Sequence, residues 1–227
     1  MKKLIAVFCL LFLSLNTAYA VLVEGVVFID NLTKNTVGES PIFNPGKVFI
    51  SEETTPLDES SDFSSTRIID VLSSSDLGTA AAKVIDGELQ TIADPGASGD
   101  FTFTYANATG FDLTLGRAYE PKFEGFVIGL KSIDQGGVDI GLTIDGKTVS
   151  QFVNTVGLAL FSKKDFVDQG VDLSSVHEII IDIHNNLEVD ATFEFFEYGF
   201  IPEPATLALF GAGLFGVGFV RRKKFNL

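Results

Sequence analysis

The chain has 227 residues, of which 46% are hydrophobic and 20% are charged, and its formal net charge is -14. This composition supplies enough apolar material for a packed core, which excludes a disordered chain. An excess of acidic over basic residues repels phosphate backbones, so nucleic acid is excluded as a partner. The only cysteine is Cys9, so neither a disulfide framework nor a cysteine-ligated metal is expected.

The N-terminus has the three parts of a secretory signal peptide. A basic pair at positions 2 and 3 precedes an apolar run over residues 4–15, and small residues follow at Ala18 and Ala20. The apolar run is shorter than the roughly 20 residues that span a bilayer, which favours cleavage over an uncleaved anchor. We therefore predict a signal peptide over residues 1–20, cut after Ala20.

The middle of the chain has the hydrophobic period of β-strands. Val138–Ile144 alternates apolar and polar residues, and Asp145-Gly146 after it predicts a two-residue hairpin turn. Ile179, Ile181 and Ile183 form one face of a later strand, with Glu178 and Asp182 on the other. Shorter runs with the same character occur at residues 26–29, 48–50, 84–85, 101–105, 126–130, 152–153 and 193–195. Strands at this spacing predict an all-β ectodomain over residues 21–200, folded as an antiparallel β-sandwich.

Two stretches, Asp76–Lys83 and Lys163–Asp168, are predicted as short helices, and neither is long enough to build an α/β fold. Ser51–Thr66 is rich in Ser, Thr and acidic residues and is predicted as a long surface loop. The many phenylalanines of the domain are expected to form its core. Asp172–Ile183 resembles a turn and late strand of jelly-roll domains, which implies a jelly-roll-like sandwich.

Few residues suit catalysis. Alternation along a strand places His177 and His184 on opposite faces, so a shared base or a two-histidine metal site is not expected. The chain has neither H-E-x-x-H nor a correctly spaced G-x-S-x-G. Paired carboxylates of the glycosidase kind stay open because acidic residues are abundant, but most of them are expected on the solvated surface. We expect that the protein is not an enzyme.

Calcium is the one cofactor that the sequence leaves open. Asp165, Asp168 and Asp172 cluster in one segment, and carboxylates are ligands that Ca²⁺ prefers. Asp134 and Asp139 flank a pair of glycines and form a second candidate. Neither group has the spacing of an EF-hand.

Glycan binding is the alternative function. Flat aromatic rings, usually Trp or Tyr, cover the apolar faces of sugars. The chain has no Trp, and outside the signal peptide its tyrosines are Tyr105, Tyr119 and Tyr198. A structural role without a small ligand is therefore favoured, and a carbohydrate-binding module, assisted by calcium, is kept as the alternative.

The C-terminal tail has three parts in a fixed order. Pro202-Glu203-Pro204 is followed by an uncharged apolar run over residues 205–220 and then by a basic cluster of Arg221, Arg222, Lys223 and Lys224. The apolar run predicts a single transmembrane helix, short but able to span a thinned bilayer. The basic cluster predicts a cytoplasmic stop, which leaves the acidic middle of the chain outside.

Residues 201–227 resemble the PEP-CTERM sorting signal of Gram-negative bacterial surface proteins, with Ile201 where that signal usually has Val. The resemblance implies that exosortase, a membrane protease-transpeptidase, recognises Pro202, Glu203 and Pro204 and cuts near them. It implies a protein held in the inner membrane before processing and found at the cell surface or outside the cell afterwards. It also implies a link with exopolysaccharide and biofilm. We expect an exported structural surface or matrix protein.

Overall fold

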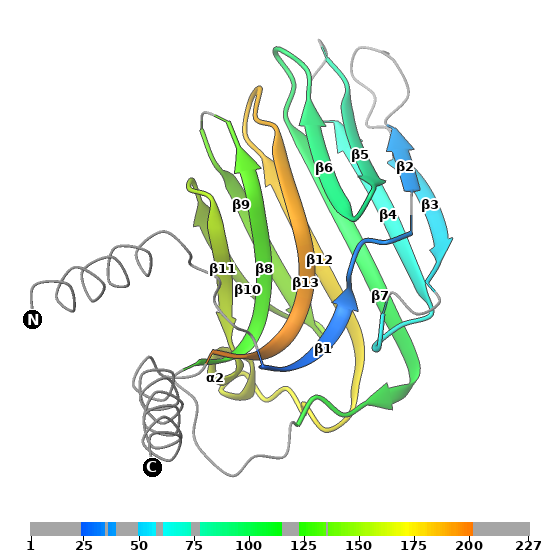
Figure 1. The fold of residues 1–227 in the computed structure, drawn as a ribbon, viewed down its shortest axis with the longest axis vertical. Coiled ribbons are helices and arrows are strands. Elements are labelled where there is room, and N and C mark those ends of the chain that lie inside the picture. Colours follow the sequence, from blue (N-terminus) through cyan, green and yellow to red (C-terminus); the bar gives the residue numbers. More distant parts are fainter. Residues whose placement is uncertain are drawn as a thin grey trace, which may run out of the picture. The chain divides into compact units, whose positions relative to one another are not determined.

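The structure is a computed structural model that describes residues 24–34, 36–39, 50–57, 61–73, 78–114, 123–134 and 136–201. Gly25–Phe200 forms one compact unit, and this unit holds two antiparallel sheets (Figure 1). No helix within the described residues is long and apolar enough to cross a membrane. The transmembrane helix predicted over residues 205–220 lies outside them.

Sheet A has seven strands in the order β11-β8-β13-β6-β5-β2, and β1 pairs with β13 beside this path. Its strands are β1 (Glu24–Asp30), β2 (Thr36–Glu39), β5 (Ala80–Ile85), β6 (Glu88–Ala93), β8 (Phe123–Ile133), β11 (Gly157–Ser162) and β13 (Ala191–Ile201). Sheet B has six strands in the order β10-β9-β12-β7-β4-β3. Its strands are β3 (Ile50–Pro56), β4 (Thr66–Ser73), β7 (Gly99–Phe111), β9 (Val138–Ile144), β10 (Lys147–Val153) and β12 (Val176–Asn185).

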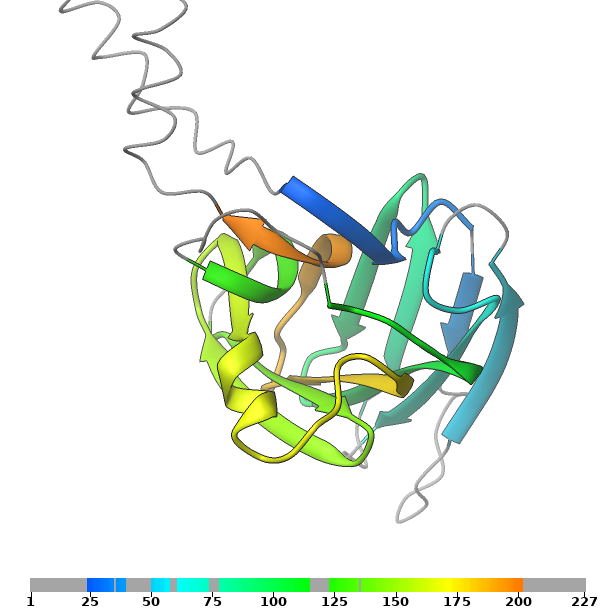
Figure 2. The same cartoon turned by 90° about the horizontal axis from the view of Figure 1, so that it is seen from below.

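The two sheets face each other in the view from below (Figure 2), and the core residues come from both of them. Strand alternation produces this core, because every second side chain of a strand points to the same face. Sheet B contributes rows of buried residues from β7, β9 and β12: Phe101, Phe103, Tyr105, Val138, Ile140, Leu142, Ile144, Ile179, Ile181 and Ile183. Aromatic rings meet them from sheet A, and the rings of Phe103 and Phe196 lie 6.0 Å apart across the core. The prediction of an all-β antiparallel fold is confirmed.

The hairpin predicted at Asp145-Gly146 is confirmed. β10 pairs antiparallel with β9 from Lys147 opposite Ile144 to Val153 opposite Val138, which leaves two residues in the turn. Asp145 and Gly146 have φ angles of 45° and 78°. Positive φ at both central residues is the requirement of a type I′ turn, which Asp-Gly satisfies.

The local predictions had mixed outcomes. A helix, α2 (Lys163–Val167), lies within the predicted Lys163–Asp168, and the side chain of Ser162 caps its N-terminus. The helix predicted at Asp76–Lys83 is wrong, because its last four residues belong to β5 and pair with β6. The surface loop predicted over Ser51–Thr66 is wrong at its start, where β3 pairs with β4. In both places tertiary pairing overrides local propensity.

Candidate functional site

The sorting tail begins where the described fold ends. β13 runs to Ile201, so the last strand of sheet A leads directly into Pro202. The candidate residues Pro202, Glu203 and Pro204, the basic cluster over residues 221–224, and the cleavage residues Ala18 and Ala20 lie outside the described residues. The described fold therefore places the start of the motif at the end of a strand.

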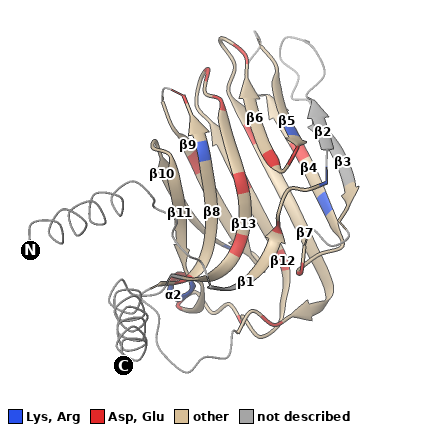
Figure 3. Cartoon of the chain, viewed as in Figure 1, with Lys and Arg blue, Asp and Glu red and all other residues tan. Residues whose placement is uncertain are grey.

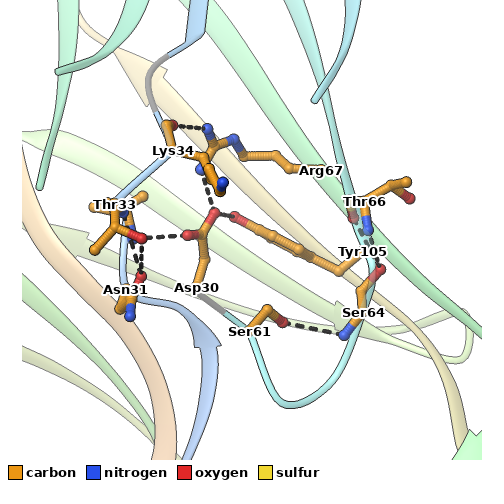
Figure 4. Close-up of polar contacts among 10 residues, drawn as sticks. Asp30, Asn31, Thr33, Lys34, Ser61, Ser64, Thr66, Arg67 and Tyr105 are labelled. Atoms are coloured by element: carbon orange, nitrogen blue, oxygen red, sulfur yellow. Dashed lines mark hydrogen bonds and ion pairs between the residues drawn. The ribbon is translucent and has the colours of Figure 1, made fainter. Parts of the chain in front are cut away.

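The most unusual group within the domain is a buried ion pair. Arg67 on β4 binds the carboxylate of Asp30 at the end of β1, and both side chains are fully buried (Figure 4). Tyr105 on β7 donates its hydroxyl to Asp30 Oδ2 at 3.0 Å. The backbone N–H of Leu32 donates to Asp30 Oδ1 at 2.7 Å. We call Asp30, Arg67 and Tyr105 the buried triad.

The buried triad connects the two sheets, because β1 belongs to sheet A whereas β4 and β7 belong to sheet B. The second guanidinium nitrogen of Arg67, Nη2, donates to the carbonyl of Lys34 at 2.6 Å and so holds the chain after β1. Burial, with the nearby Asp30 carboxylate, raises the pKa of Tyr105 well above its ordinary value, so its hydroxyl stays protonated as a donor. The triad is sealed from solvent, which favours a structural role.

Sequence reasoning missed the triad, although one signal was present. In β4, Arg67 is in phase with Ile69 and Val71, which are both buried. A cation in phase with two β-branched residues of an alternating strand is a candidate for the inward face. A buried guanidinium requires a carboxylate partner, and several acidic residues were equally available to supply it.

The calcium candidates on and after α2 are engaged separately. The carboxylate of Asp168 forms an ion pair with Lys164. Asp172 Oδ1 accepts hydrogen bonds from the N–H and hydroxyl of Ser174 at 3.0 and 2.6 Å, and these lower the pKa of Asp172. The side chain of Asp165 lies in the first turn of α2. Within the described residues, no group of three or more His, Cys, Asp and Glu side chains is placed to hold a metal ion.

The second acidic pair is also separated. Asp134 Oδ1 accepts from the N–H of Asp190 at 2.8 Å, which ties the end of β8 to the start of β13. Asp139 lies on β9 in register with His184 of β12. Asp134 and Asp139 therefore have different neighbours, and the structure does not bring them together as a pair of ligands.

The histidines both lie outside the core, although alternation predicts opposite faces. A register shift between Val176 and Glu178 interrupts the alternation of β12, and His177 is exposed beside it. His184 is half-buried and contacts Asp100 through its Nδ1 atom. The prediction that His177 and His184 lie on opposite faces therefore does not apply, because the bulge adds a residue between them and breaks the alternation.

The described tyrosines are not available as sugar platforms. Tyr105 belongs to the buried triad, and Tyr198 is buried with its hydroxyl donating to Glu124 Oε1 at 3.0 Å. The ring of Tyr198 packs against Phe126 with centroids 4.8 Å apart. Tyr119 lies outside the described residues. Stacking of a sugar on Tyr105 or Tyr198 would require the core to open.

Comparison with known proteins identifies the tail. The family model of the PEP-CTERM protein-sorting motif matches residues 200–223. A search of curated protein sequences found no match. Among solved structures, an agarase is similar at 12% identity and a TM-score of 0.36, with 73% of this chain and 25% of that chain covered. An enzymatically active domain of tailspike protein 4 of bacteriophage CBA120 is similar at 14% identity and a TM-score of 0.27, with 76% and 20% covered.

Fold and tail together define the class: an all-β domain of two antiparallel sheets, followed by a C-terminal sorting signal. The signal is the PEP-CTERM protein-sorting motif, which confirms the resemblance seen in the sequence and supports an exosortase substrate. This motif indicates an exported protein that is anchored at the membrane before processing. The chain spans a quarter or less of the two solved structures reported above.

Proposed function

We propose that the protein is a structural component of the cell surface or extracellular matrix, that it associates with exopolysaccharide, and that it has no enzymatic activity. The observation that carries the proposal is the sorting motif over residues 200–223, which begins in the last two residues of β13, the last strand of the two-sheet domain. Exosortase cutting near Pro202 would free a domain that already contains both sheets. The released domain is the working part of the protein.

The chemistry of the described residues supports a role without catalysis. Tyr105, whose pKa is raised by burial, is enclosed in the buried triad and contacts no solvent. His177 is exposed at the bulge of β12. His184 lies further along the same strand and pairs with Asp100 of β7. Catalysis requires an acid or base together with a reacting atom in one accessible site. These placements favour scaffolding over turnover.

Processing is tested by replacing Pro202, Glu203 and Pro204 with alanine in the full chain, expressed in its host. Because the sorting motif includes these three residues, their loss should remove the sequence that the protease recognises. We expect the variant to accumulate uncut in the membrane fraction, as measured by fractionation and intact mass. An Asn154→Ala variant, altered at an exposed residue of the β10–β11 connection, is the control and should be processed normally. Normal processing of the triple variant would refute the sorting assignment.

Association with the matrix is tested with residues 21–201, which include the compact unit Gly25–Phe200. This fragment is sedimented with the host's own exopolysaccharide in the presence of calcium or of a chelator. Co-sedimentation in both conditions supports the structural proposal, whereas calcium-dependent binding supports the alternative of a carbohydrate-binding module. Release of soluble sugars by the pure fragment would overturn the non-enzymatic assignment.

A further inference from the structure

One side of the sandwich has a surface without charge. From Thr148 to Ser162 the sequence contains no Lys, Arg, Asp or Glu, in a chain whose formal net charge is -14. This stretch, which we call the neutral edge, forms most of β10 and all of β11. Lys147 and Lys163 flank it on either side. The two strands carry neither red nor blue between these lysines (Figure 3).

The neutral edge occupies the end of both sheets. Within the described strands, β10 is bonded to β9 alone and β11 to β8 alone, because each is the first strand of its sheet. In an antiparallel ladder, alternate residues direct their N–H and C=O groups toward one neighbour and the rest direct them to the other side. β10 therefore has a row of backbone donors and acceptors on its outer side, which is a template for another strand.

Apolar side chains are exposed along this edge. Phe152 on β10 is 54% exposed, Val156 in the connection to β11 is 60% exposed, and Leu160 on β11 is 37% exposed. Burying such side chains against a partner is favourable by roughly 25 cal/mol per Å² of apolar surface. The edge thus combines backbone groups directed away from β9 with exposed apolar side chains, which a partner strand could bind.

The opposite side of the sandwich has the features of a protected edge. There β2 ends in Glu39, and β3 has the sequence Ile-Ser-Glu-Glu-Thr-Thr-Pro with Glu52, Glu53 and Pro56. Charges and proline on an edge strand discourage pairing with another chain. β10 has no proline and, after Lys147, no charge. Protection against strand addition is therefore present on one side and missing on the other.

We propose that β10 is the interface of a homodimer, in which it pairs antiparallel with β10 of a second copy and continues sheet B across a twofold axis. This inference rests on the proposed structural function and names its partner. A second copy fits because two acidic domains repel each other on most faces, whereas the neutral edge brings no like charges together. The edge is also self-complementary, as an isologous contact requires.

The twofold axis passes beside Ser150, the middle residue of Lys147–Val153. In this register Ser150 faces its own counterpart, and Thr148 faces Phe152 of the second copy. Lys147 then lies opposite Val153 of the second copy, which keeps the two lysines at opposite ends of the interface. Side chains directly opposite each other on paired antiparallel strands are in contact, so these residues would interact across the interface.

The first test is a cysteine placed on the axis. The only cysteine of the chain is Cys9, so residues 21–201 with Ser150→Cys contain a single thiol. Under mild oxidation we expect a disulfide-linked dimer, because the two sulfur atoms would meet across the axis. Ile85→Cys, at a position 38% exposed on β5 of the other sheet, is the matched control and should stay monomeric. Equal cross-linking of both variants would overturn the interface.

The second test is a charge on the axis. A lysine at position 150 is tolerated in the monomer because Ser150 is exposed. Ser150 and Asp182 are both in register with Gly141, which places an acidic residue near the added ammonium. In the dimer two lysines would face each other, which is unfavourable. Sedimentation velocity over a concentration series should show a dimer for the wild-type fragment and for Ile85→Lys, and loss of the dimer for Ser150→Lys.

Several outcomes overturn the interface. A wild-type fragment that stays monomeric at every concentration does so, as does a Ser150→Lys variant that dimerises like the wild type. Circular dichroism confirms that each variant is folded before it is compared. A monomeric fragment that still co-sediments with exopolysaccharide would refute the dimer and leave the proposed function in place. A dimer that does not co-sediment would support this interface and refute the matrix association.

Discussion

Arg67 and Asp30 show how strongly one buried pair constrains this domain. Both side chains are fully buried, and Asp30 also accepts hydrogen bonds from Tyr105 and from the backbone of Leu32. Removing one member of a buried ion pair leaves an uncompensated charge, whereas removing both with apolar substitutes is far less harmful. The stability of the domain therefore depends on Asp30 and Arg67 being present together.

The prediction concerns Asp30→Ala alone and combined with Arg67→Met. Asp30→Ala should lower the free energy of unfolding of residues 21–201 by about 3–5 kcal/mol, because Arg67 stays buried without its carboxylate. Adding Arg67→Met should restore part of that loss. Denaturant unfolding measures both, with Tyr105→Phe as a milder comparison at about 1 kcal/mol. If the double variant is less stable than Asp30→Ala, the charge is not the cause.

Glu197 on β13 makes stability depend on pH. Its carboxyl is half-buried, and this desolvation raises its pKa from 4.5 to about 7. In the unfolded chain the same carboxyl ionises near its ordinary pKa, so between these two values the folded state binds more protons. The contribution of Glu197 to stability is thus greatest at low pH and declines as pH rises from about 4.5 to 7.

Glu197→Gln should remove this dependence. At pH 8 we expect the variant to be more stable than the wild type by about 1–2 kcal/mol, a value reduced because solvent screens a partly exposed carboxyl. At pH 4 the two proteins should unfold alike. Thermal or urea unfolding at both pH values measures the difference. A variant that is less stable than the wild type at pH 8 would show that the ionised carboxylate is stabilising.

At the scale of single elements, two glycines distinguish a turn requirement from a packing requirement. Gly146 has a φ angle of 78° in the β9–β10 turn, and nothing lies within 4 Å of the position that a Cβ would take. At Gly125 on β8 a Cβ would lie 2.0 Å from the carbonyl oxygen of Phe161 on β11. Both positions have a positive φ angle, 78° at Gly146 and 158° at Gly125, but only Gly125 also lacks the space for a side chain.

Alanine should therefore act differently at the two glycines. Gly146→Ala should cost about 1–2 kcal/mol, the usual penalty of a left-handed conformation for a residue with a Cβ. Gly125→Ala should cost about 3 kcal/mol or more, since β8 and β11 would have to separate. Chemical denaturation of the fragment measures both. Similar losses at the two positions would contradict the close approach of Phe161 to Gly125.

Element types were predictable where one signal dominated. In the run Val138–Ile144 followed by Asp145-Gly146, the strand alternation and the turn residues both predicted a hairpin, and the structure confirmed it. The Ala-rich stretch Asp76–Lys83 has high local helix propensity, but Ala80, Ala82 and Val84 have buried positions on β5. Burial of alternate residues in a sheet outweighs a propensity of a few tenths of a kcal/mol per residue.

At the scale of the whole molecule, net charge should control association. Residues 24–197 carry far more acidic than basic side chains, whereas the neutral edge carries none. Long-range repulsion between two copies should weaken as salt shortens the Debye length, which is about 10 Å at 0.1 M and about 3 Å at 1 M. The apolar and backbone contacts of β10 are not weakened by this screening.

We therefore expect dimerisation of residues 21–201 to strengthen with ionic strength. The measurement is the dissociation constant from sedimentation equilibrium at low salt and at about 1 M NaCl, where screening is nearly complete. The same series on Ser150→Lys controls for non-specific association at high salt. Weaker dimerisation at high salt would mean that ion pairs, rather than the neutral edge, hold the two copies together.

The sequence by itself determined the sorting tail and the strand character of the domain. Pro202-Glu203-Pro204, the apolar run and the basic cluster are contiguous in the chain, and strand periodicity depends on near neighbours, so neither requires knowledge of the fold. Only the tertiary structure decided which acidic residue pairs with Arg67, where β12 bulges, and that β10 and β11 both lie at a sheet end. The physical reason is that these features depend on residues far apart in the chain. Their contacts arise from strand order and packing, which local pattern does not contain.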